Sequence, residues 1–230
     1  MRLSKYIAHS GFCSRRDAEK LIKDNKVLIN NRICNDYSYS VNEKDKVYIN
    51  NILLKKPNEV EMYILNKPRG YITSKKDELK RKTVYDLIPS DKRNLISIGR
   101  LDYNTEGLLL FTNNGDLARY FELPKNKISR IYKVKVYGNV TKQIINKINS
   151  GINIKGTVHQ IDEIKLIKNL KTNSWYSIKL SEGKNREIRK IFENFNLTVN
   201  RIIRTNYGEY SLNNIKLGEF KKIILKKTIY

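Results

Sequence analysis

One acidic residue, Asp102, lies in a segment whose composition suits acid–base or nucleophilic chemistry. Residues 99–111 read GRLDYNTEGLLLF, so Asp102 stands in an irregular loop directly before a strongly apolar strand. A carboxylate at such a junction is expected to be partly desolvated, which disfavours its charged form unless a cation lies near it. It could act as a general base or as a nucleophile. The plainer alternative is a loop-capping aspartate paired with Arg100.

Arg189 is a second candidate because it lies at the edge of an apolar helix face. On a helical wheel, Arg186 and Lys190 are expected to point away from this face, which is formed by Ile188, Ile191, Phe192 and Phe195. An edge position lets a guanidinium reach a loop carboxylate while its stem stays packed. An ordinary arginine at the rim of the core is the alternative.

Tyr132 lies in a segment that alternates as a half-buried strand does. In residues 131–136, Tyr132, Val134 and Val136 share one face, and Lys133 and Lys135 share the other. Pattern alone indicates a core aromatic residue. If the ring borders a cleft, its exposed part could also contact a ligand.

The elements that must position these residues read as mixed α and β from about residue 60. Strands are predicted at 62–65, 108–112, 131–136 and 176–180, and helices follow the turns at 113–115 and 182–185. Residues 1–50 read as a separate small module, residues 51–59 as a linker, and residues 60–230 as the larger domain. The predicted fold class is α+β, with a mixed, mainly antiparallel sheet and flanking helices.

The first module combines a short basic helix with a hairpin. Ser14 to Asp17 form a capping-box start, and the following helix has an apolar stripe of Ala18, Leu21 and Ile22. Its other side carries basic residues that could lie along phosphates or simply face solvent. A tight turn at residues 30–31 joins two strands, because asparagine tolerates the left-handed conformation.

The charge of the chain favours a polyanionic partner. With 46 Lys and Arg against 23 Asp and Glu, the formal net charge is +23. Nucleic acid would neutralise this charge with release of counterions. An anionic membrane surface is a second choice, since no long amphipathic basic helix stands out, and a general lysine bias in the source proteome is a third explanation.

Compartment and cofactor expectations follow from what the composition lacks. No run approaches the roughly 20 apolar residues of a membrane span, and the chain does not start with an apolar signal core. Cys13 and Cys34 form no CxxC pair, and His9 and His159 are far apart. We expect a reduced cytoplasmic protein with no membrane partner and no metal.

The motifs of both domains resemble known families. RLSKYI at 2–7, GFCSRRDAE at 11–19 and VLINN at 27–31 resemble an S4 RNA-binding domain, in which Asn31 replaces the usual glycine. KPRG at 67–70, GRLD at 99–102 and EGKNREIRK at 182–190 resemble, in order, the motifs of the RsuA-type family of pseudouridine synthases. Together these motifs cover nearly the whole chain.

The resemblance implies a cofactor-free isomerisation of uridine to pseudouridine, with the catalytic set Asp102, Arg189 and Tyr132. Asp102 would be the catalytic carboxylate, working by a covalent or a glycal-type route, and Arg189 would pair with it and keep it ionised. Tyr132 would stack on the uracil. The substrate-binding set would be Arg100, Ile188 and Lys67. Glu106 invites a paired-carboxylate hydrolase interpretation, but the family varies at this position, so it is excluded from catalysis.

RNA must be gripped while the target base is flipped out of its stack. The expected RNA-binding residues are Arg15, Arg16, Lys20, Lys75, Lys76 and Arg81; the last three belong to a predicted loop that also holds Lys80 and Lys82. The alternative for this loop is that its basic residues simply face solvent and bind no RNA.

The expected partner is ribosomal RNA, a 23S stem-loop or the assembling large subunit, bound by a monomer. LLLFTNNGDLA at 108–118, SEGKNRE at 181–187 and RIIRTNYG at 201–208 most resemble the 23S enzymes of the RluB kind. A 16S enzyme is the first alternative. A non-catalytic S4-type ribosome-assembly factor is the second, and a DNA-binding regulator is a weaker third.

Overall fold

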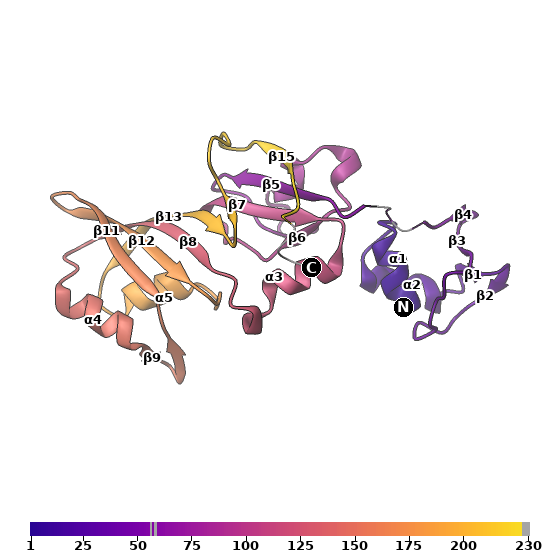
Figure 1. Ribbon diagram of the computed structural model, residues 1–230, viewed down its shortest axis with the longest axis horizontal. Coiled ribbons are helices and arrows are strands. Elements are labelled where there is room, and N and C mark those ends of the chain that lie inside the picture. The colour runs from indigo at the N-terminus through magenta and orange to yellow at the C-terminus, as the bar shows by residue number, and fades with distance from the viewer. Residues whose placement is uncertain (56, 58, 227–230) are drawn as a thin grey trace.

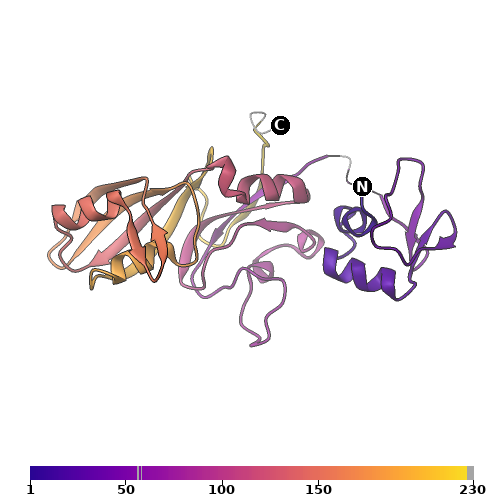
Figure 2. The same cartoon turned by 90° about the horizontal axis from the view of Figure 1, so that it is seen from below.

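The computed structural model describes residues 1–55, 57 and 59–226, which form a small N-terminal domain and a larger domain built on one long sheet (Figures 1 and 2). No helix in these described ranges is long and apolar enough to cross a membrane. The predicted α+β class, with a mainly antiparallel sheet, is confirmed.

The N-terminal domain packs two helices against a four-stranded sheet of order β2-β1-β3-β4. Its elements are α1 Leu3–His9, α2 Arg15–Lys23, β1 Val27–Ile29, β2 Arg32–Ile33, β3 Val47–Ile49 and β4 Ile52–Leu53. The Ser14 hydroxyl caps α2 by accepting from the Asp17 amide at 3.2 Å, and Ala18 and Ile22 are fully buried, as the stripe predicted.

Two asparagine turns set the register of this small sheet. Asn30 and Asn31 have φ values of 50° and 66°, and Asn50 and Asn51 repeat the arrangement at 50° and 62°. Two consecutive residues at positive φ make the tight turn whose twist matches antiparallel strands. The second hairpin carries the sheet to Leu53, beyond the boundary at residue 50, and Leu54 is buried in the core of this domain.

The larger domain is organised around a sheet of order β11-β12-β8-β13-β7-β5-β15, with β14 paired to β13 and β6 to β7. Its strands are β5 Met62–Lys67, β6 Ile96–Ile98, β7 Thr105–Thr112, β8 Arg130–Tyr137, β11 Glu163–Asn169, β12 Asn173–Leu180, β13 Thr198–Tyr207, β14 Tyr210–Ser211 and β15 Phe220–Ile223. The other elements are η1 Val84–Leu87, η2 Ser90–Lys92, α3 Gly115–Glu122, η3 Pro124–Asn126, α4 Lys142–Ser150, the hairpin β9 Ile152–Ile154 with β10 Thr157–His159, and α5 Glu187–Glu193.

A single parallel contact joins the two halves of this sheet. β13 runs parallel to β7 at Ile202–Thr105, Ile203–Glu106 and Arg204–Gly107, whereas the other pairs along the sheet are antiparallel. Gly107 is required here, because a Cβ at this position would lie 2.3 Å from the Arg204 carbonyl oxygen. The loop that carries Asp102 leads directly into β7 at this junction.

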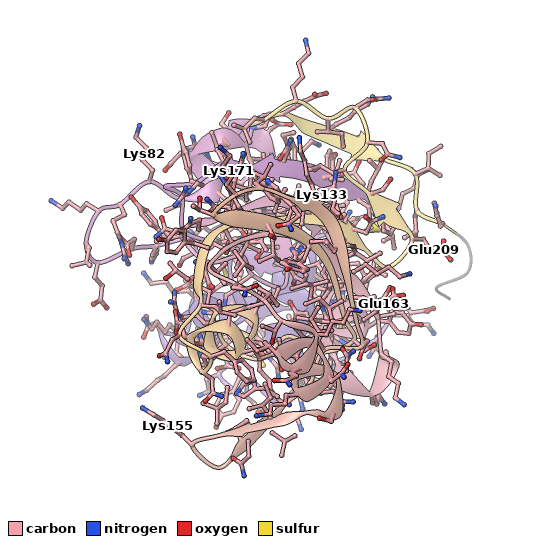
Figure 3. The ribbon with its side chains drawn as sticks, turned by 90° about the vertical axis from the view of Figure 1, so that its left-hand side faces the viewer. Lys82, Lys133, Lys155, Glu163, Lys171 and Glu209 are labelled. Carbon is pink, nitrogen blue, oxygen red and sulfur yellow. The ribbon has the colours of Figure 1, made fainter. Side chains whose placement is uncertain are left out.

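The apolar faces of the strands form the core as their patterns predicted. Tyr132, Val134 and Val136 of β8 are buried, and so are Tyr176, Ile178 and Leu180 of β12. Ile191 and Phe192 of α5 pack against this face, whereas α5 ends at Glu193, before the partly buried Phe195. Seen along the long axis, Lys82 and Lys155 extend outward at the upper left and the lower left of the view (Figure 3).

Candidate active site

Residues 99–104 form the loop that carries Asp102, between β6 and β7, and neighbouring groups hold its backbone. The Leu101 carbonyl accepts from Thr73 Oγ1 at 2.9 Å. The Tyr103 carbonyl accepts from the Gly70 amide at 2.9 Å. Because the carbonyls on either side of Asp102 are fixed from outside the loop, the position of Asp102 is set before any ligand binds.

Lys67 completes this support from beneath the loop. Its side chain is fully buried, and Nζ donates to the carbonyls of Pro68 at 3.1 Å, Asp102 at 3.1 Å and Thr105 at 2.8 Å. Burial lowers the pKa of Lys67 to about 8, although the negative charges of Asp102 and Glu106 oppose this shift. Since these bonds use its three donors and Lys67 does not line the cavity, its geometry favours support of the loop over the expected direct substrate contact.

The Asp102 carboxylate itself is exposed, contrary to the expected partial desolvation. No residue in the ranges 1–55, 57 and 59–226 donates a hydrogen bond to it or pairs with it within 4 Å. The alternative interpretation, a loop-capping aspartate paired with Arg100, is therefore not borne out. The charges of Lys67 and Arg189 are close enough to interact with it electrostatically. The carboxylate is thus free to contact a ligand while its backbone is held.

Arg189 bridges α5, β13 and the Asp102 loop. Its Nη1 donates to the Val199 carbonyl at 2.7 Å, and Nη2 lies 3.5 Å from the Asn104 carbonyl oxygen. Nε is buried without a hydrogen-bond partner among the described residues. Burial is the main cause of a lowered Arg189 pKa, followed by the nearby Arg186, whereas Asp102 acts in the opposite direction. The expected direct pair with Asp102 is not formed in this structure.

The start of α5 is fixed by a buried pair between two segments. His159 of β10 and Glu187 are nearly inaccessible, and His159 Nδ1 lies 3.2 Å from Glu187 Oε1. Glu187 Oε2 also accepts from the Lys184 amide at 3.1 Å. This anchor sets the helix turn that carries Ile188 and Arg189. Arg186 does not point away as the wheel suggested: it precedes the helix in a left-handed conformation and lines the cavity.

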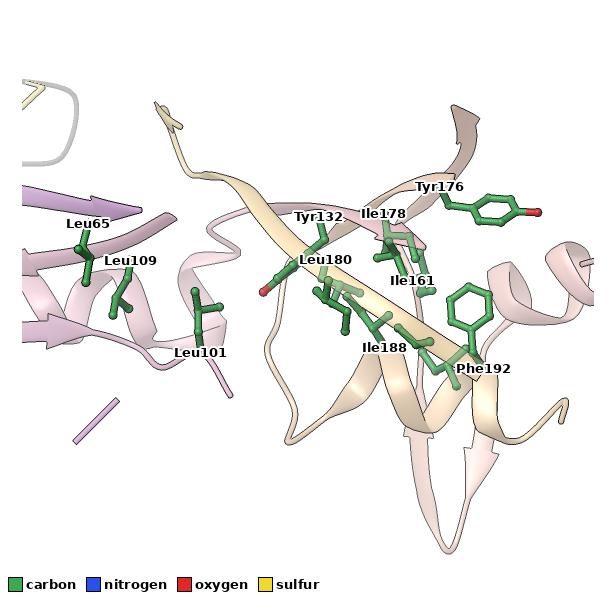
Figure 4. Packing of buried hydrophobic residues seen from close by; sticks show 14 of the residues in the cluster. Leu65, Leu101, Leu109, Tyr132, Ile161, Tyr176, Ile178, Leu180, Ile188 and Phe192 are labelled. Atoms are coloured by element: carbon green, nitrogen blue, oxygen red, sulfur yellow. The ribbon is translucent and has the colours of Figure 1, made fainter. Parts of the chain in front are cut away.

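These segments enclose a cavity of about 530 Å³. It is lined by five of the predicted site residues, namely Arg100, Asp102, Tyr132, Ile188 and Arg189. Tyr132 and Ile188 are 8% and 5% exposed, so both are core residues that also line the cavity. In Figure 4 the Tyr132 ring lies between the Leu101 side and the Leu180–Ile188 side, with its hydroxyl directed toward Leu101.

The cavity is also lined by residues that were not predicted as site residues, among them Arg130, Arg204 and Tyr207. Arg130 is 6% and Arg204 is 2% exposed. Arg130 lies two residues before Tyr132 on the same strand face, and Arg204 is directly opposite Tyr132 across the β8–β13 pair. A charged residue at an inward position of a strand is the sequence signal that would have indicated them.

Glu106, excluded from catalysis above, is engaged elsewhere. It is buried and forms a two-bond ion pair with Arg201, at 2.9 Å to Nε and 2.6 Å to Nη2. Glu106 does not line the cavity. A paired-carboxylate mechanism with Asp102 therefore has no geometric basis.

The predicted RNA-binding residues lie around α2 and the loop after β5. Arg15, Arg16 and Lys20 are exposed on α2. Lys75 and Lys76 interact electrostatically with Asp17 of the same helix, which brings the two basic groups together. Lys75 is partly engaged, because Nζ donates to the Asn94 carbonyl at 3.0 Å.

Arg81 differs from the other predicted RNA-binding residues. It forms a two-bond pair with Asp77, at 3.0 and 2.7 Å. The Asp77 carboxylate compensates the charge of Arg81, so the contribution of Arg81 to RNA binding is expected to be smaller than that of the α2 residues.

Comparison with known proteins agrees with this geometry. Residues 61–194 match the sequence profile of the RNA pseudouridylate synthase family, and residues 1–47 match that of the S4 domain. This chain belongs to the RNA pseudouridylate synthase family and carries an N-terminal S4 domain. The predicted resemblance and the enzyme class, a pseudouridine synthase, are thereby confirmed.

Several relatives match over nearly their whole length. An RNA pseudouridine synthase of Rickettsia bellii is 46% identical, covering 98% of this chain and 97% of the relative. The ribosomal large subunit pseudouridine synthases B of Buchnera aphidicola (subsp. Acyrthosiphon pisum) and Bacillus subtilis are 36% and 34% identical, each over 96% of this chain and 92% and 91% of their own lengths. A crystal structure of a pseudouridylate synthase matches with a TM-score of 0.68 at 27% identity, covering 97% of this chain and 96% of that one.

Proposed function

We propose that this enzyme converts a specific uridine of 23S ribosomal RNA to pseudouridine, with Asp102 as its catalytic carboxylate. The observation that carries the proposal is the convergence of Arg100, Asp102, Tyr132, Ile188 and Arg189 from separate segments on one cavity. The relatives named as large-subunit enzymes support the choice of 23S over 16S RNA. We further propose that the enzyme works as a monomer in the cytoplasm.

The cavity is suited to one nucleotide flipped out of an RNA stem or loop. Its volume of about 530 Å³ falls within the usual range of small-ligand sites. Tyr132 and Ile188 provide an aromatic and an aliphatic surface for the uracil, and stacking on an aromatic ring contributes about 1–3 kcal/mol per base. This stacking offsets the cost of unstacking the base from the RNA.

Asp102 acts at the ribose of the bound nucleotide. The bond from C1′ to N1 breaks, the detached uracil turns, and C5 bonds to C1′; C5 then loses its proton and N1 gains one, so the product is an isomer of the substrate. A carboxylate assists either by attacking C1′ as a nucleophile or by removing a ribose proton as a base. Both routes need a carboxylate with unoccupied oxygens on a rigid backbone, and Asp102 has this combination. No oxidant, reductant or group donor enters the balance.

Arg189 and Tyr132 assist this residue. Arg189 supplies positive charge beside Asp102 while anchoring the loop through the Asn104 carbonyl. Tyr132 holds the face of the uracil, and its hydroxyl is a candidate acceptor for the C5 proton. Arg100, exposed at the mouth of the cavity, is placed to hold the flipped nucleotide or its phosphate.

A pseudouridine map tests the proposed substrate. Ribosomal RNA from a strain lacking the gene would be mapped by carbodiimide modification and reverse transcription, with the gene for the unaltered enzyme or for Asp102→Asn restored. We expect one or more 23S sites to disappear and to return only with the unaltered enzyme. Loss of a 16S site with intact 23S sites would overturn the 23S assignment, and an unchanged map would overturn the proposed activity.

A further inference from the structure

Two buried arginines of the cavity have no negatively charged partner. Neither Arg130 nor Arg204 forms an ion pair within 4 Å with any carboxylate in the part of the chain that the structure describes. Yet they are 6% and 2% exposed. Burying an uncompensated charge is unfavourable, and buried cations are usually paired with an anion. An anion bound in the cavity would supply the missing charge.

Arg204 has unused hydrogen-bond donors as well as unused charge. Its Nε donates to the Leu108 carbonyl at 2.7 Å. Nη2 is buried and lacks any hydrogen-bond partner among the described residues. Arginine has no acceptor atoms, so these donors can be satisfied only by oxygens of a ligand or of water. A planar guanidinium that lines the cavity is suited to oxygens of a phosphate.

Arg130 and Tyr207 hold Arg204 in place. The guanidinium carbons of Arg130 and Arg204 each lie 4.8 Å from the centre of the Tyr207 ring. The Tyr207 hydroxyl donates to the Phe121 carbonyl at 3.0 Å and accepts from Arg130 Nη2 at 3.0 Å. Arg130 is itself occupied with the carbonyls of Ser181 and Phe121. Arg204 is therefore the member of this group with spare donors.

The position of Arg204 relates it to the bound nucleotide. It lies directly opposite Tyr132 across the β8–β13 pair, and both residues line the cavity. Side chains directly opposite on antiparallel strands have Cβ atoms about 4.5–5.5 Å apart. A uracil stacked on Tyr132 would thus leave its own ribose and phosphate within reach of the neighbouring guanidinium.

We propose that Arg204, held by Tyr207 and Arg130, binds a backbone phosphate of the RNA beside the target uridine. The inference rests on the proposed function, because it takes the uracil to lie on Tyr132. It assigns the anchoring of the sugar–phosphate chain to a strand residue that the sequence analysis did not single out as a site residue. The contact forms in the ground state and in the transition state alike, so its main effect is on KM.

Kinetics of the full chain test this contact. Arg204→Gln and Arg204→Lys would be compared with Lys133→Gln, which removes an exposed cation from the other face of β8, using ribosomal RNA transcripts labelled with [5-³H]uridine. Loss of one charge-assisted phosphate bond should raise KM about ten- to hundredfold while kcat changes little. Lysine, a cation without the planar fork, should restore part of the affinity.

Salt dependence separates phosphate binding from a structural role. The slope of log kcat/KM against log salt should become shallower by about 0.7–0.9 in Arg204→Gln, the value for one phosphate contact. A variant that is merely less well packed would keep the slope of the unaltered enzyme. An unchanged slope, or a fall in kcat at constant KM, would overturn the inference.

A second measurement does not depend on activity or on the folding of the glutamine variant. Inorganic phosphate should raise the Tm of the unaltered enzyme more than chloride does at equal ionic strength, and Arg204→Lys should show a smaller effect. Equal effects of phosphate and chloride on the unaltered enzyme would contradict the site. If the unaltered enzyme released no tritium from any ribosomal transcript, the proposed function would fail, and this titration would still decide on the phosphate site.

Discussion

Replacing Lys67 with methionine separates two roles that a lysine beside the Asp102 loop could have. Lys67→Met keeps an unbranched side chain of similar length and removes the donors that hold the carbonyls of Pro68, Asp102 and Thr105. If Lys67 supports the loop, the variant should lose kcat. If Lys67 instead contacts the substrate, as its motif suggested, the variant should lose affinity and keep kcat.

The expected stability change is small because two effects oppose each other. Three hydrogen bonds from a charged donor contribute about 1.5 kcal/mol each at the low end of the usual range, or about 4–5 kcal/mol together. The low end applies because the Asp102 carbonyl keeps its bond from the Thr105 amide. Against this, the fall of the Lys67 pKa from 10.5 to about 8 corresponds to a burial cost of about 3 kcal/mol. Methionine removes that cost, so the net destabilisation is about 1–2 kcal/mol.

The catalytic effect should be much larger than the stability effect. Without Lys67, the carbonyls of Asp102 and Thr105 lose their common donor, and the loop can shift relative to the cavity. A displacement of about 1 Å at a reacting group lowers the rate by about a hundredfold. We therefore expect kcat to fall about a hundredfold while KM changes little.

Tritium release and urea denaturation measure the two quantities on the same preparation. Lys221→Met, at an exposed position on β15, is the matched control and should retain both activity and stability. A Lys67→Met enzyme that keeps kcat and shows a raised KM would refute the loop-support role. So would a loss of stability large enough to account for the lost activity by unfolding.

The remaining predictions concern pH, an ion pair and a helix cap. The neutral amine form of Lys67 has one hydrogen-bond donor fewer than the ammonium form, so kcat should fall as pH rises through about 8. The same fall of kcat in Lys67→Met would contradict this. The folded chain binds the Lys67 proton less tightly than the unfolded chain does. Lys67 therefore lowers the free energy of unfolding by its full amount below about pH 8, and this loss of stability shrinks as pH rises toward 10.5. Arg201→Met leaves Glu106 buried without its partner and should lower the free energy of unfolding in urea by about 2 kcal/mol; no change would show that the pair is not stabilising. Ser14→Ala removes the cap on the Asp17 amide and should cost about 1 kcal/mol in thermal unfolding, whereas an unchanged Tm would assign that cap no energetic role.

The elements and most of the site were predictable because local signals agreed with the fold. Alternation placed Tyr132 on the buried face of β8, the Asn30–Asn31 turn set the first hairpin, and the apolar stripe placed Ile188 against the core. What the sequence could not supply was the parallel contact of β13 with β7, which depends on pairing between distant segments. That contact is what brings Arg204 beside the Asp102 loop.

Side-chain roles were harder to predict than positions. Lys67 belongs to a recognisable motif, yet the motif does not reveal that its ammonium group points into the protein and binds backbone carbonyls. Arg186 was placed away from the cavity by an ideal helical wheel, but it precedes α5 and has a φ of 52°. The burial of the Lys67 side chain and the left-handed backbone of Arg186 are both set by tertiary contacts, which override the local pattern.

The role of Asp102 is tested most directly by tritium release from [5-³H]uridine-labelled ribosomal RNA. Asp102→Ala should abolish release, because C5 loses its hydrogen only when it bonds to C1′, while RNA binding measured on the same preparation should be retained. Asp91→Ala, which removes an exposed carboxylate of η2, should release tritium at the rate of the unaltered enzyme. Sustained release by Asp102→Ala would contradict the assignment of this carboxylate to catalysis.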